Sequence, residues 1–211
     1  MLLLGIDLGT SSVKVSVIDA STQQTVATAQ YPESEAEIIS LHPGWAEQSP
    51  DSWWEQVQLA ILKLHAQRAY NPADIGAIGI AYQMHGLVLV DKDQQVIRNS
   101  IIWCDSRAVE TGDKAFDKIG HDKCLLHLLN SPGNFTASKL AWVKENEPAI
   151  YEKIDKVMLP GDFIGMKLTG TITTSIEALS EGVFWDFKEN ALSEDVFGYY
   201  GFSHSLIPEI R

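Results

Sequence analysis

The chain has 211 residues, of which 45% are hydrophobic and 21% are charged, a composition typical of a soluble globular protein. Its formal net charge of −12 argues against nucleic acid and against an anionic membrane as partners. No stretch approaches the ~20 apolar residues that a membrane helix needs, so we expect a cytoplasmic protein.

The first elements expected along the chain are short strands joined by turns. Residues 2–6 form an apolar run, residues 7–12 are rich in turn formers, and residues 13–19 alternate strictly between apolar and polar side chains. After another turn, residues 25–31 are typical of a third strand. Because the connections are short, these strands are predicted to form an antiparallel meander.

A helix and a further strand follow a loop at residues 42–48. Ser49 is a good N-cap and Pro50 suits the first helical position, so a helix is predicted from there to about Arg68. One face is expected to carry Trp54, Val57, Ile61 and Leu64, and both Trp53 and Trp54 are expected to lie in the core. Residues 75–82 are almost continuously apolar, which predicts a strand buried on both faces.

The rest of the chain is expected to be mainly helical. Strands are predicted at residues 87–90 and 96–103, and helices at residues 108–119, 123–129, 136–146, 148–153 and 163–168. Cys104 and Cys124 have no zinc or redox spacing and are expected to be reduced thiols. The element order β-β-β-α-β-α predicts an α/β fold, a mixed sheet with helices on both faces.

The turn after the first strand has the residues of a phosphate site. Gly9 allows a tight turn and a close approach of the backbone to a ligand, and residues 10–12 offer hydroxyl groups and successive amide donors. Asp7 at the strand end can hold Mg²⁺ or its waters, and Lys14 adds a cation. The alternative is a plain β-hairpin whose turn is rich in glycine and serine. The turn is neither a Walker A loop nor a dinucleotide fingerprint.

Residues 5–11 resemble the first phosphate segment of the superfamily of actin, sugar kinases and chaperone ATPases. Further stretches resemble the FGGY family of carbohydrate kinases, and within it the xylulokinases most closely. These stretches are Pro43-Gly44-Trp45-Ala46-Glu47-Gln48, Gly79-Ile80-Ala81-Tyr82-Gln83-Met84-His85-Gly86 and Phe135-Thr136-Ala137-Ser138-Lys139-Leu140-Ala141-Trp142-Val143. The resemblance covers essentially the whole chain. It implies a ribonuclease H-like, actin-like ATPase fold, with residues 1–211 as the N-terminal domain of a two-domain kinase.

The resemblance also implies ligands and site residues. ATP and Mg²⁺ are the expected cofactors, with Asp7 at the metal. The phosphate-binding residues are expected to be Gly9, Thr10, Ser11, Ser12 and Lys14. Gln83, Met84 and His85 are expected to meet the sugar, because an imidazole can hydrogen-bond a hydroxyl and a methionine can pack on a carbon face.

A second pair of sugar-binding residues is expected from the family's Trp-x-Asp-x-Arg run. Trp103 and Asp105 match it, and an indole wall with a carboxylate is a common way to hold a polyol. Arg107 has the alternative role of a helix-start residue paired to Asp105. Asn134 stands where glycerol kinases present a tyrosine, which argues against glycerol as the substrate. Most of residues 135–143 are expected to be structural.

The catalytic base that the resemblance implies is an Asp in a Gly-rich segment, and neither Asp162, Asp186 nor Asp195 has that setting. We therefore expect the base beyond Arg211, and we expect the chain to be cut short before that segment and before the second, nucleotide-binding domain. Alone, the chain is then predicted to be inactive, since a general base contributes ~10²–10⁴ in rate.

The expected reaction is transfer of the γ-phosphoryl group of ATP to a ketopentose, with D-xylulose giving D-xylulose 5-phosphate as the first choice. Gluconate, L-xylulose and ribulose stay open as substrates, and a homodimer stays open as the assembly. The alternative classes are a non-catalytic, actin-like or chaperone-like nucleotide module and a structural domain with a fortuitous turn. Residues 83–86 and 103–107 favour the kinase, because an ATPase switch needs no groups that face a sugar.

Overall fold

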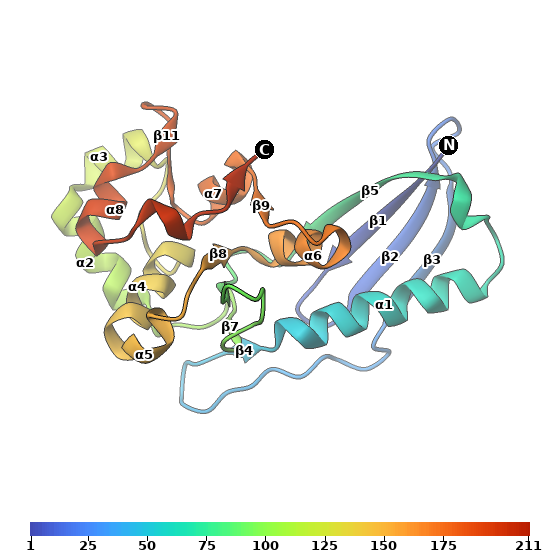
Figure 1. Ribbon diagram of the computed structural model, residues 1–211, viewed down its shortest axis with the longest axis horizontal. Coiled ribbons are helices and arrows are strands. Elements are labelled where there is room, and N and C mark those ends of the chain that lie inside the picture. Colours follow the sequence, from blue (N-terminus) through green and yellow to red (C-terminus); the bar gives the residue numbers. More distant parts are fainter. The chain divides into compact units, whose positions relative to one another are not determined.

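The computed structural model describes residues 1–211 and divides into two compact units. The first unit combines Met1–Ile38 with Ser49–Gln83, and the second combines Ile39–Gln48 with Met84–Arg211. Their elements are labelled in Figure 1. None of the helices has the length and apolar character required to cross a bilayer. Both cysteines are free thiols, as predicted.

The first unit is built on a four-stranded mixed sheet with the order β3-β2-β1-β5. Its strands are β1 (Leu2–Leu8), β2 (Val13–Asp19), β3 (Thr25–Tyr31) and β5 (Ile75–Tyr82). β1 and β3 both pair antiparallel to β2, which confirms the predicted meander. β5 pairs parallel to β1, so these two strands end at the same edge of the sheet.

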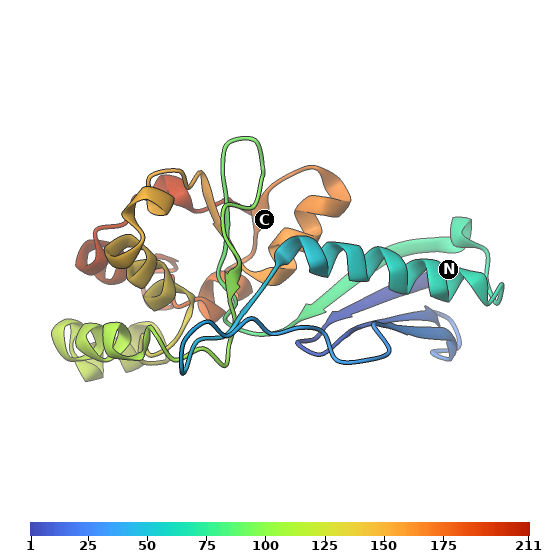
Figure 2. The same cartoon turned by 90° about the horizontal axis from the view of Figure 1, so that it is seen from below.

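Helix α1 (Pro50–Ala66) packs along one face of this sheet, as Figures 1 and 2 show. Ser49 caps it by accepting a hydrogen bond from the Ser52 amide, and Pro50 is the first helical residue, both as predicted. The short 3₁₀ helix Pro72–Asp74 leads from α1 into β5. The side chains that α1 buries against the sheet are Trp53, Val57, Ala60 and Leu64.

The predicted buried face of α1 was wrong at two positions. Trp54 and Ile61 are only half-buried, because the buried stripe runs through Ala60 and through Trp53, which is in the core as predicted. A small residue at position 60 allows close packing of helix on sheet, and apolar periodicity alone does not reveal this.

The prediction that residues 75–82 are buried on both faces was also wrong. β5 is an edge strand, and the side chain of Ile78 is 48% exposed. Within this unit the sheet is covered by a helix, α1, on one face. The other face carries small or polar residues such as Gly5, Ser16 and Gly79, which need no apolar cover.

The second unit consists of helices and short strand pairs. Its helices are α2 (Val109–Ile119), α3 (His121–His127), α4 (Thr136–Asn146), α5 (Pro148–Tyr151), α6 (Pro160–Thr169), α7 (Ile176–Glu181) and α8 (Glu194–Tyr200). The strand pairs are β4 (Glu47–Gln48) with β7 (Ser100–Ile101), β6 (Val88–Val90) with β8 (Lys156–Met158), β9 (Thr173–Thr174) with β12 (Glu209–Ile210), and β10 (Trp185–Asp186) with β11 (Ala191–Leu192). A 3₁₀ helix spans His204–Leu206.

The predicted helices of this unit were all found, and α4 has the bounds predicted for it. α4 contributes Leu140 to an apolar core that also includes Phe184 and Phe197. The strand predicted at residues 96–103 was wrong, since only Ser100–Ile101 forms β7. Arg98 lies in this segment, and its guanidinium forms buried ion pairs with Glu47 and Glu147.

Candidate functional site

The predicted phosphate hairpin is the β1–β2 connection of the first unit. The amide of Gly9 donates to the carbonyl oxygen of Ser12 at 3.1 Å, which closes the turn. A Cβ at Gly9 would lie 2.9 Å from that oxygen, so this tight turn requires glycine. Ser12 is buried, whereas Ser11 is exposed and Thr10 is half-buried. The turn therefore presents Thr10 and Ser11 at the surface of the first unit.

Asp7 and Lys14 lie opposite each other on β1 and β2, next to this turn. Lys14 Nζ is 3.9 Å from Asp7 Oδ2, and more than half of each side chain is exposed. No group of three or more His, Cys, Asp or Glu residues in the chain forms a metal cage. A single accessible carboxylate fits Mg²⁺, which usually keeps several waters and binds through one or two carboxylates plus substrate phosphates.

Gln83, the first residue of the predicted sugar segment, lies against the same turn. Thr10 Oγ1 donates to Gln83 Oε1 at 3.1 Å, and the Gln83 amide donates to the Leu8 carbonyl oxygen at 2.7 Å. The second bond extends the pairing of β1 with β5 by one residue. Gln83 is buried at this sheet edge, so its amide side chain helps to fix the turn.

Met84 and His85 belong to the second unit. The side chain of Met84 is 54% exposed. His85 has a positive φ of 60°, a left-handed conformation that is uncommon for a residue with a Cβ. Burial lowers the pKa of His85 to about 4, and the charge of Lys139 acts in the same direction. His85 is thus a neutral imidazole at neutral pH.

The backbone of His85 is held on both sides by charged side chains. Its amide donates to Glu181 Oε1 at 2.5 Å, and its carbonyl oxygen accepts from Lys139 Nζ at 2.7 Å. The ring stacks edge-on against Phe135, with 4.3 Å between ring centroids. Lys139 is fully buried on α4, and this burial lowers its pKa to about 8.

Trp103 and Asp105 lie in very different environments. The side chain of Trp103 is 48% exposed, as a sugar-stacking wall would require. Asp105 is 1% exposed, and its carboxylate binds Arg107 through Nε and Nη2 at 2.7–3.0 Å. Its Oδ2 also accepts from the Ala46 amide at 2.6 Å. Contact of Asp105 with a sugar stays a prediction, but its observed bonds brace the protein.

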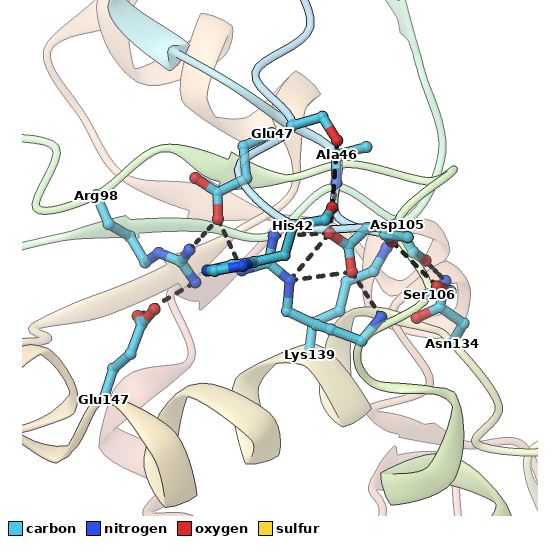
Figure 3. A network of polar contacts seen from close by, with 12 residues as sticks. His42, Ala46, Glu47, Arg98, Asp105, Ser106, Asn134, Lys139 and Glu147 are labelled. Carbon is cyan, nitrogen blue, oxygen red and sulfur yellow. Dashed lines mark hydrogen bonds and ion pairs between the residues drawn. The ribbon is translucent and has the colours of Figure 1, made fainter.

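Asp105 belongs to a buried network of charges, drawn in Figure 3. Arg107 Nη1 is 2.7 Å from Glu47 Oε1, and Arg98 Nη2 contacts the same oxygen at 2.5 Å. Arg98 Nη1 in turn lies 3.4 Å from Glu147. Every cation of the network thus has a carboxylate partner, which offsets the cost of its burial.

Aromatic and backbone contacts tie this network to the loop at residues 39–48. The Arg107 guanidinium lies 3.8 Å from the ring centre of Trp45 and 5.0 Å from that of Trp142. The Ser106 amide donates to the Gly44 carbonyl oxygen at 2.8 Å. Asn134 Nδ2 donates to the Asp105 carbonyl oxygen, and Lys139 lies beside these groups in Figure 3. The motifs at residues 43–48 and 103–107 therefore form one braced structure.

The predicted site residues fall into two groups, one in each unit. The hairpin residues and Gln83 belong to the first unit. Met84, His85, Trp103 and Asp105 belong to the second. Arg107 pairs with Asp105 at the start of a helical segment, as the alternative interpretation had it. None of the ligand contacts is tested by the structure, so they stay predictions.

The roles of two residues around His85 differ from or go beyond what the sequence predicts. Lys139 belongs to the stretch expected to be structural, and no role is predicted for Glu181. A lysine within a buried helical stretch, between Ser138 and Leu140, is a usable signal, because buried lysines need specific partners. Nothing in the local sequence points to Glu181, since its contact with His85 spans 96 residues.

Comparison with known proteins identifies the family. The sequence model of the N-terminal domain of the FGGY family of carbohydrate kinases matches residues 2–211. The chain belongs to this family. It is 35% identical to the xylulose kinase of Escherichia coli K12 and 32% identical to that of Bacillus subtilis 168. Each alignment covers 98% of this chain and 41% of the relative, so the chain spans less than half of their length.

Solved structures show the same fold. A xyloylose kinase from Brucella ovis is 31% identical, with a TM-score of 0.90 over 100% of this chain and 43% of that one. The xylulose kinase from Rhodospirillum rubrum is 25% identical, with a TM-score of 0.88 over 100% of this chain and 43% of that one. The predicted actin-like ATPase fold of the sugar kinases is therefore confirmed.

Proposed function

We propose that the whole protein to which this chain contributes is an ATP-dependent sugar kinase that phosphorylates D-xylulose. The supporting observation is the junction of Thr10 with Gln83, which brings the predicted phosphate turn and the start of the predicted sugar segment to one sheet edge. The xylulose kinases among the relatives support the choice of sugar. A ketopentose and ATP are thus the proposed substrates.

Asp7 is proposed to hold Mg²⁺ on the phosphates of ATP, with Gly9, Thr10, Ser11, Ser12 and Lys14 around the phosphates. The metal would neutralise charge on the phosphoryl group during transfer. The chain's own part is positioning: Gly9 permits a close approach of backbone, and Thr10 and Ser11 offer hydroxyl donors. Met84, His85 and Trp103 are proposed to orient the sugar.

The 211 residues alone are proposed to be inactive, because none of the Asp residues between 160 and 211 has the Gly-rich setting expected of the base. All three of these Asp residues have structural partners. Asp162 accepts from the Leu159 amide and the Thr174 hydroxyl at 3.1 and 3.0 Å. Asp186 pairs with His127, and Asp195 with Lys123. The base is proposed to lie in the remainder of the protein.

A substrate scan with the whole protein tests this function. ADP release is measured with ATP, Mg²⁺ and D-xylulose, L-xylulose, ribulose, gluconate or glycerol. The highest kcat/KM is expected for D-xylulose, and Asp7→Asn is expected to lower it by at least ~10²-fold through weaker metal and phosphate positioning. Asp93→Asn, at an exposed turn, is the matched control. Turnover of gluconate alone would overturn the sugar but not the class, and absence of turnover on every sugar would overturn both.

A further inference from the structure

His85 is the residue whose surroundings carry an inference beyond the proposed sugar contact. It is held in a left-handed conformation by two charges that approach its backbone from different helices, Lys139 on α4 and Glu181 on α7. A strained residue persists only where its surroundings over-determine it. Here the amide and the carbonyl of one residue are each bound by a charged group, at 2.5 and 2.7 Å.

The same carboxylate also faces the ring. His85 Nδ1 is buried and makes no hydrogen bond, and Glu181 Oε1 lies 3.5 Å from it. A bare nitrogen lone pair at that place would face a carboxylate oxygen and be repelled by it. A proton on Nδ1 turns this contact into an attraction.

We propose that Glu181 and Lys139 are positioning residues that fix the rotamer and tautomer of His85, so that its Nε2 is a hydrogen-bond acceptor for a sugar hydroxyl. This inference rests on the proposed function for the identity of the ligand. The ring keeps one proton, on Nδ1 toward Glu181, and its Nε2 accepts a hydrogen bond from a hydroxyl that the sugar donates. The site would then select a sugar with a hydroxyl at this point over a deoxy analogue, because the acceptor would otherwise lose its partner.

Lys139 adds an electrostatic part to this arrangement. Its buried ammonium binds the His85 carbonyl oxygen and disfavours a second positive charge on the nearby imidazole. Lys139 and Glu181 are the charged groups that face His85. A neutral ring is required for the acceptor role, since a protonated imidazole has only donors.

Nitrogen NMR of the ring in the 211-residue chain tests the tautomer without any activity. Wild-type His85 is expected to carry its proton on Nδ1 and to remain neutral down to about pH 5. Glu181→Ala is expected to move the proton toward Nε2, and Lys139→Met to raise the pKa of His85. Glu177→Gln on exposed α7 surface and Lys144→Met, which removes a bond to the Tyr200 carbonyl oxygen, are matched controls. An Nε2–H tautomer in the wild type, or no change in Glu181→Ala, would overturn the proposal.

Kinetics of the whole protein then test the consequence for the sugar. Glu181→Ala is expected to raise the KM for D-xylulose about tenfold with a smaller change in kcat, as for loss of one oriented hydrogen bond. Glu181→Gln keeps an acceptor oxygen for the His85 amide and for Nδ1–H. Its KM is expected to lie within about threefold of the wild-type value. An unchanged KM in Glu181→Ala contradicts the positioning role. If the wild type turns over no sugar while the ring behaves as expected, the proposed function fails and the tautomer assignment stands.

Discussion

Thr10 Oγ1 donates a hydrogen bond to Gln83 Oε1 at 3.1 Å, across 73 residues of sequence. The contact is possible because β1 and β5 run parallel, which brings their carboxyl ends to one edge of the sheet. In open α/β sheets, ligands bind outside this edge. The predicted phosphate turn and the predicted sugar segment therefore meet at this edge through Thr10 and Gln83.

The turn at this edge should depend on Gly9. Gly9→Ala places a methyl group 2.9 Å from the Ser12 carbonyl oxygen, so the backbone must shift. We expect the free energy of unfolding to fall by about 1–3 kcal/mol in urea titrations of the chain. Gly79→Ala on β5 is the matched control, because no atom lies within 4 Å of its added methyl group. Equal stability of the two variants would contradict this view of the turn.

Much of this architecture could be predicted from local sequence. The meander, the Ser49 cap and α4 depend on alternation, capping and helical periodicity, which act over a few residues. The burial of β5 could not be predicted, because an apolar run of 75–82 does not reveal whether the strand lies at a sheet edge. Which face of α1 is buried could not be predicted from apolar periodicity alone, because that face includes Ala60, a small residue that packs on the sheet.

The candidate site was predictable where residues are contiguous and not where distant contacts define their roles. Asp105 looked like a ligand carboxylate, but its oxygens bind Arg107 and the Ala46 amide, which lies 59 residues away. The partners of His85 come from α4 and α7, and no local pattern links them to it. Ionic networks of this kind cannot be predicted from local sequence, because their members come together only in the folded chain.

The buried network should be intolerant of even a conservative change at Arg107. Lys cannot reproduce the paired bonds to Asp105 or the stacking on Trp45, and it leaves buried carboxylates short of partners. Arg107→Lys is expected to lower the free energy of unfolding by about 3 kcal/mol, measured by urea denaturation. Lys114→Met, which breaks the exposed pair with Glu110, should cause no measurable change. Similar midpoints for the two variants would show that the network does not stabilise the fold.

Asp162 should make the stability of the chain depend on pH. Burial raises its pKa to about 6 from an ordinary value of 3.8, although the Leu159 amide and the Thr174 hydroxyl favour its charged form. The folded state therefore binds more protons than the unfolded state between about pH 4 and pH 6, and the contribution of Asp162 to stability falls as pH rises through this window.

Asp162→Asn removes this titration and keeps an acceptor oxygen for the cap. The difference in unfolding free energy, variant minus wild type, is expected to rise by up to about 3 kcal/mol from pH 4 to pH 7. Thr174→Val removes a hydrogen bond to the carboxylate, so the loss of stability with pH should become larger. A difference that stays constant with pH would show that Asp162 does not titrate in this range.

Gly86, directly after His85, should be required for the close packing of the predicted sugar segment on α6. A Cβ at Gly86 would lie 2.5 Å from Cγ of Pro160, the first residue of α6, and 3.4 Å from Ser100 Oγ. The proline ring is rigid, so Gly86→Ala must displace either α6 or the backbone of His85. We expect unfolding free energy to fall by about 1–3 kcal/mol and the KM for D-xylulose in the whole protein to rise. Gly165→Ala within α6 meets no atom within 4 Å and should be neutral or stabilising by about 0.5–1 kcal/mol. A stable Gly86→Ala variant with unchanged KM would mean that the packing of Pro160 on this glycine does not position His85.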